Sequence, residues 1–98
     1  MRVELTEDAE LDIKQIFEFI AGRGDVLNAS RVFKRIHQHI LTLVSFPERA
    51  RESDAYPGAR ELVIKNLPYV AVFYVDGDVV RVVAVVHTRR LLPVALDE

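Results

Sequence analysis

The strongest constraint on the fold is a pair of valine-rich segments joined at Asp76-Gly77. Residues 69–75 and 78–87 are mostly β-branched or aromatic, and each has the length of a single strand. Asp-Gly is a strong signal for a two-residue type I′ turn, because both central positions of that turn require positive φ. We therefore predict an antiparallel hairpin in which Val75 pairs with Asp78.

Both faces of this hairpin are rich in valine, so both are expected to be at least partly covered. A pair of helices can cover only one face, and something else, such as a partner chain, is expected to cover part of the other. In the predicted register Arg81 and His87 lie on this second face. The apolar and aromatic residues expected beside them are Val70, Val72, Tyr74, Val79, Val83 and Val85.

Two amphipathic helices are predicted before the hairpin. Thr6 and Asp25 are expected to cap their N-termini, and apolar residues recur at helical spacing after each cap. Gly22 and Gly24 end the first helix and Pro47 ends the second. The short link between them favours an antiparallel helical hairpin.

Two further segments complete the expected fold. Residues 2–5 alternate as in a short strand, residues 47–58 form a polar loop, and residues 60–64 have the pattern of another strand. The order is β-α-α-β-β-β, an α+β fold in which a helical hairpin packs on an antiparallel sheet. We expect a single domain over residues 1–98, with residues 91–98 as a C-terminal tail.

Composition narrows the range of partners. The formal net charge of −2 disfavours a surface that grips nucleic acid through its phosphates. No apolar run approaches the roughly 18 residues needed to cross a bilayer, so we expect a cytoplasmic protein without a membrane partner. The chain has no cysteine, and His37 and His39 point about 200° apart on a helix, so neither a metal nor another cofactor is expected.

Three short motifs carry a resemblance to a known family. They are Gly58-Ala59-Arg60, Leu67-Pro68-Tyr69 and His87-Thr88-Arg89-Arg90, and each stands at the end of a predicted strand. In this order and spacing the chain resembles the RelE/ParE superfamily of toxins from type II toxin–antitoxin modules. The resemblance covers nearly the whole chain.

The resemblance implies one of two activities. ParE-like members poison DNA gyrase, and RelE-like members are endoribonucleases that cleave mRNA on the ribosome. The ribonuclease branch uses basic residues on the sheet, but residues 69–75 contain none, so we favour a ParE-like toxin without chemistry of its own. Either branch implies a small antitoxin as partner, here a ParD-like one, and we expect it to dock on the second face of the hairpin.

The resemblance also supplies candidate site residues. Those expected to contact the target are Arg60, His87, Arg89 and Arg90. The alternative ribonuclease site would consist of Arg60, Arg81, His87 and Arg89. In a regular strand the even separations among residues 81, 87 and 89 would place their side chains on one face of the sheet.

Overall fold

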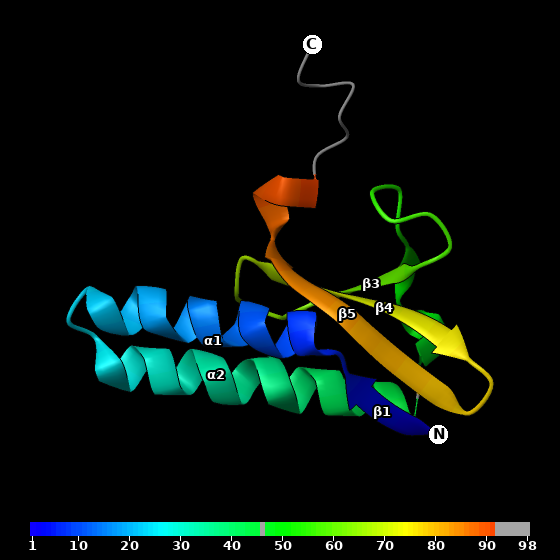
Figure 1. Cartoon of the computed structure of the whole chain (residues 1–98), viewed down its shortest axis with the longest axis horizontal. Coiled ribbons are helices and arrows are strands. Elements are labelled where there is room, and N and C mark those ends of the chain that lie inside the picture. Colours follow the sequence, from blue (N-terminus) through cyan, green and yellow to red (C-terminus); the bar gives the residue numbers. More distant parts are fainter. Residues whose placement is uncertain (46, 92–98) are drawn as a thin grey trace, which may run out of the picture.

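The computed structural model describes residues 1–45 and 47–91, and shows two helices packed on one face of a twisted sheet (Figure 1). The chain begins with β1 (Arg2–Leu5), α1 (Glu7–Gly22) and α2 (Val26–Leu41). Two short 3₁₀ turns follow, η1 (Thr42–Val44) and η2 (Pro47–Arg49). The remaining elements are β2 (Arg51–Glu52), β3 (Arg60–Val63), β4 (Tyr69–Asp76), β5 (Val79–His87) and the 3₁₀ helix η3 (Thr88–Leu91).

The five strands lie in the order β1-β5-β4-β3-β2. β1 pairs with β5 in parallel, and every other pairing is antiparallel. The predicted α+β class and order of elements are confirmed, with one addition, because β2 lies inside the segment that was expected to be only a loop. The second helix also ends earlier than predicted, at Leu41, and continues as a 3₁₀ turn.

Both predicted helix caps are present. The Thr6 hydroxyl accepts a hydrogen bond from the backbone N–H of Ala9 at 3.2 Å. The Asp25 carboxylate accepts one from the N–H of Asn28 at 3.1 Å. Each bond satisfies a backbone donor in the first helical turn that has no partner inside the helix.

The main core lies between the helices and the sheet. Ile13, Ile36 and Phe73 are almost fully buried at its centre. Full burial of a side chain of this size stabilises the fold by roughly 1.5–3 kcal/mol. The core therefore fixes which face of each strand the helices cover, and on β4 that face carries Tyr69, Ala71 and Phe73.

The hairpin turn lies one residue later than predicted. Asp76 pairs with Val79, so Gly77 and Asp78 are the central residues of the turn. Among the described residues of the turn only Gly77 has positive φ, at 58°. A type II′ turn needs positive φ only at its first central position, which glycine occupies here at no steric cost. The predicted pairing of Val75 with Asp78 is therefore wrong, and Val75 pairs with Val80.

A β-bulge at Val83 changes the face on which the second half of β5 presents its side chains. Phe73 pairs with Val82, but the preceding Val72 pairs with Ala84, so Val83 is an extra residue. Beyond this point the two faces of β5 are exchanged relative to a regular strand. Val85 consequently joins the main core beneath the helices, and the prediction that it lies on the second face is wrong.

Candidate target-contact site

The basic end of β5 turns directly into η3. The backbone N–H of Thr88 donates to the carbonyl of Pro68 at 2.9 Å, and the N–H of Arg89 donates to Nδ1 of His87 at 3.2 Å. An imidazole nitrogen that accepts a hydrogen bond carries no proton, so the neutral ring holds its proton on Nε2. The Arg89 side chain is exposed, whereas that of Arg90 lies outside the described residues.

His87 forms one wall of a groove between α1 and the ends of β4 and β5. Its ring lies edge-to-face with that of Tyr69, at a centroid distance of 5.7 Å. The groove has a volume of about 280 Å³. Its lining residues are Asp12, Gln15, Ile16, Phe19, Tyr69, Val85, Val86 and His87. Burial in this wall raises the pKa of the Tyr69 phenol, because the tyrosinate would lose solvation there.

Arg81 lies on the opposite face of the sheet from His87. Its pairing partner on β4 is Tyr74, whereas that of His87 is Tyr69, and an odd number of residues separates these two tyrosines in a regular strand. The expectation that Arg81 and His87 share a face is therefore wrong. The Val83 bulge is the physical reason.

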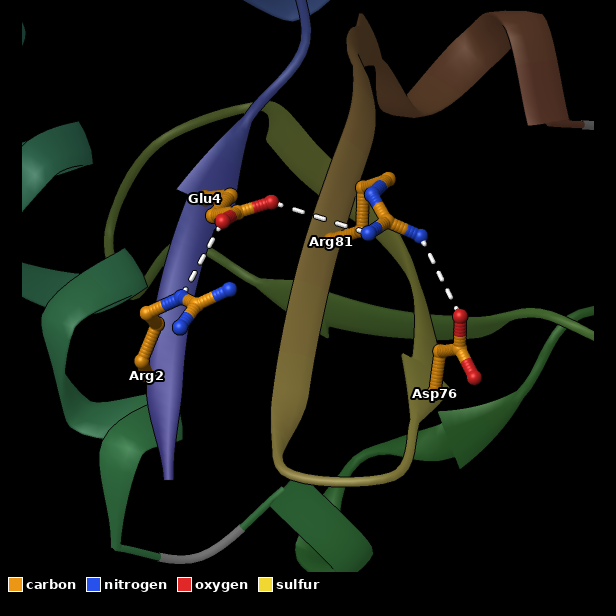
Figure 2. A network of polar contacts seen from close by, with 4 residues as sticks. All are labelled: Arg2, Glu4, Asp76 and Arg81. Carbon is orange, nitrogen blue, oxygen red and sulfur yellow. Dashed lines mark hydrogen bonds and ion pairs between the residues drawn. The ribbon is translucent and has the colours of Figure 1, made fainter.

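The Arg81 guanidinium belongs to an exposed network of ion pairs at the turn end of the hairpin. Its nitrogens lie 3.6 Å from a carboxylate oxygen of Glu4 and 3.5 Å from one of Asp76, as Figure 2 shows. The other carboxylate oxygen of Glu4 accepts a 3.0 Å hydrogen bond from Arg2. Three strands, β1, β4 and β5, are bridged in this way, and Arg81 serves this network rather than the groove.

Arg60 is also engaged elsewhere. Its guanidinium donates to the carbonyl of Ala50 at 2.8 Å. The adjacent Glu61 is 5% exposed, pairs with Arg51 at 2.8 Å and accepts a 2.7 Å hydrogen bond from the Ser53 hydroxyl. This buried cluster, which the sequence analysis missed, ties the segment after β2 to β3. The four residues of the ribonuclease alternative are thus not brought together as one constellation.

The second face of the hairpin is covered by the chain itself. A small cluster of Ala59, Val72 and Ala84 is buried there, with Tyr56 and Tyr74 packed against it. Of the six residues expected to bind a partner, Val70, Val72 and Val85 are buried, and only Tyr74, Val79 and Val83 keep part of their surface. The segment before β3 therefore does much of the covering that the sequence analysis assigned to another element.

Exposed apolar side chains gather instead on the helical hairpin. Its tip projects beyond the edge of the sheet (Figure 1). The exposed residues are Leu11, Phe19, Val26, Leu27, Phe33 and Leu41. Phe33 packs edge-to-face with Phe17 at a centroid distance of 6.1 Å, and both line a groove of about 440 Å³ between α1 and α2. An apolar helical pattern alone did not distinguish these residues from the core.

The two helices differ in charge. α2 carries Arg31, Lys34 and Arg35 and no carboxylate, and within the described part of the chain none of these three cations pairs with a carboxylate. His37 and His39 each donate from Nδ1 to the backbone carbonyl four residues earlier, at 3.0 and 3.1 Å. α2 therefore offers positive charge beside an apolar groove.

Comparisons with known proteins agree with this architecture. A family model described as the ParE toxin of the type II toxin–antitoxin system parDE matches residues 3–92. A solved structure of the chromosomal ParDE toxin–antitoxin system from P. aeruginosa superposes with a TM-score of 0.82 at 21% identity, covering 89% of this chain and 95% of that one. No curated protein matches the sequence. No helix within residues 1–45 and 47–91 is long and apolar enough to span a membrane.

Proposed function

We propose that this chain, which belongs to the ParE toxin family of type II toxin–antitoxin systems, inhibits DNA gyrase and thereby blocks replication. The observation that carries the proposal is the match of the ParE model to residues 3–92. It is supported by the separation of Arg81 from His87, which removes one cation from the ribonuclease alternative. The slightly acidic net charge also favours a protein target over an RNA.

The surface proposed for gyrase contact is the end of β5 with η3. Arg89 is exposed and can offer its guanidinium fork to a carboxylate of a target protein. His87 keeps part of its ring accessible, with its Nε2 proton free to donate. Arg90 and Arg60 complete the candidates named from the sequence, and Arg60 would act with only the surface left by its bond to Ala50.

A ParD-like antitoxin is the proposed neutralising partner. The groove between α1 and α2 is a suitable docking surface, because Phe17 and Phe33 provide apolar anchors there. The unpaired cations of α2 favour an amphipathic partner segment that carries carboxylates. Contacts to Tyr74, Val79 and Val83 on the sheet remain part of this proposal, since these side chains keep some exposed surface.

The test is inhibition of plasmid supercoiling by purified gyrase. We compare the wild-type chain with Arg89→Glu and with a matched control, Arg31→Glu, which reverses an equally exposed arginine on α2. Arg89→Glu is expected to weaken inhibition by about tenfold, equivalent to about 1.4 kcal/mol of binding energy. The control should inhibit like the wild type. Absence of inhibition by the wild-type chain, with mRNA cleavage in a parallel translation reaction, would refute the proposal.

A further inference from the structure

The groove between α1 and the end of β5 contains apolar surface that the proposed target contact does not use. Phe19 lines it and is 62% exposed, although aromatic side chains of this size are usually covered. It lies on the half of α1 that projects beyond the sheet (Figure 1). Ile16 and Val86 continue the apolar lining toward His87.

A cation stands at the far end of this groove. The guanidinium of Arg23 lies 5.5 Å from the centre of the Phe19 ring, in a cation–π contact. No carboxylate of the described residues pairs with Arg23. The groove thus begins at a histidine, continues along apolar side chains and ends at an arginine without an acidic partner.

The sequence that follows η3 has the complementary pattern. Residues 92–98 are Leu-Pro-Val-Ala-Leu-Asp-Glu, an apolar stretch followed by two carboxylates. In an extended conformation Leu92, Val94 and Leu96 share one face, and Pro93 is compatible with that conformation. The segment starts after Leu91, four residues beyond the His87 wall of the groove.

The length of the segment matches the length of the groove. From Asp12 to Arg23, α1 rises by about 16 Å at 1.5 Å per residue. Six extended residues, 92–97, span about 20 Å. A chain that leaves η3 next to His87 can therefore follow the groove to its end.

We propose that residues 92–98 bind back into this groove, with Leu92, Val94 and Leu96 against Ile16 and Phe19. The carboxylates of Asp97 and Glu98 then lie at Arg23. This intramolecular contact goes beyond the proposed gyrase inhibition and does not depend on it. Its consequence is that the segment covers the rings of Tyr69 and His87 and competes with any partner that enters the groove.

The absence of cysteine from the chain allows a direct test by disulfide formation. The full-length variant Gln15→Cys/Val94→Cys places one thiol on the groove and one in the segment. The control, Ser30→Cys/Val94→Cys, places the first thiol on the exposed surface of α2, which contributes no residue to the groove. Both substituted helix positions are exposed, so the fold should tolerate the two changes equally.

The rate of intramolecular disulfide formation in glutathione buffer is followed by thiol labelling and mass spectrometry. Docking raises the effective concentration of the two thiols, so the groove variant should close at least about tenfold faster than the control. Adding Arg23→Glu to the groove variant should slow closure by about threefold, the effect of losing an exposed ion pair. Equal rates in the groove and control variants would overturn the proposal, and an unchanged rate with Arg23→Glu would overturn the anchoring at Arg23.

Discussion

The backbone N–H of Val85 donates a 3.0 Å hydrogen bond to the carboxylate of Asp12. β1 ends at Leu5, whose partner on β5 is Val82, so the outer edge of β5 beyond that point has no neighbouring strand. An unpaired edge leaves buried backbone groups without partners. Asp12 supplies one of the missing acceptors from α1, and it thereby ties the helix to the half of β5 that follows the bulge.

We predict that Asp12→Ala lowers the free energy of unfolding by about 1–2 kcal/mol, because the Val85 donor is left unsatisfied. Asp12→Asn retains a carbonyl acceptor and should lose less. Urea denaturation followed by circular dichroism measures both changes. Glu18→Ala, at an exposed position of the same helix, is the control. A loss for Asp12→Ala no larger than that of the control would show that the bond adds nothing to stability.

The buried Glu61 cluster gives a second stability prediction. Glu61→Ala removes the acceptor of both Arg51 and Ser53, and the Ser53 hydroxyl is itself 8% exposed. We expect a loss of about 2–3 kcal/mol in the free energy of unfolding, measured in the same way. Glu52→Ala removes an exposed carboxylate two strands from the core and should change stability by less than about 0.5 kcal/mol. Similar values for the two variants would contradict this account.

The raised pKa of Tyr69 predicts a dependence of stability on alkaline pH. The phenol has its ordinary pKa of 10.0 in the unfolded chain and a higher one in the folded protein, because burial disfavours the tyrosinate. Its contribution is fully present below the unfolded pKa, and it is lost as pH rises through the folded pKa. Between about pH 9 and about pH 11 the wild type should therefore lose more stability than Tyr69→Phe, in which the other two tyrosines are unchanged. Parallel stability curves for the two proteins would rule out this effect.

Phe33 tests the proposed antitoxin surface. Its side chain is 42% exposed at the groove between the helices, so Phe33→Asp should leave the fold largely intact while weakening antitoxin binding by at least about tenfold. Leu27→Asp is the matched control, because Leu27 is 76% exposed on the same helix and does not line the groove. Isothermal titration with the antitoxin encoded in the neighbouring reading frame measures both. Equal affinities for the two variants would place the antitoxin elsewhere.

Local signals in the sequence predicted the elements of the fold well. The Thr6 and Asp25 caps, the helical hairpin and the long β-hairpin follow from short-range chemistry, and each is present. The Val83 bulge had no such signal, because Val82, Val83, Ala84 and Val85 are apolar on both faces. Where alternate positions do not differ in polarity, an extra residue leaves the sequence pattern unchanged.

The bulge had direct consequences for the candidate site. It moved Val85 into the main core and separated His87 from Arg81, so the residues expected on one face were divided between two. The turn was ambiguous for a similar reason, because Asp76-Gly77-Asp78 allows glycine to be either the second or the first central residue. The pairing of Glu61 with Arg51 depends on the register of β2 against β3, and no local pattern specified that register.

The most direct test of the central claim is pulse labelling of cells after induced expression of the chain, with thymidine and methionine incorporation followed in parallel. Inhibition of gyrase predicts an early fall in thymidine incorporation while methionine incorporation is maintained. An early fall in methionine incorporation with thymidine incorporation unchanged would mean that translation is the process affected, and it would contradict the account.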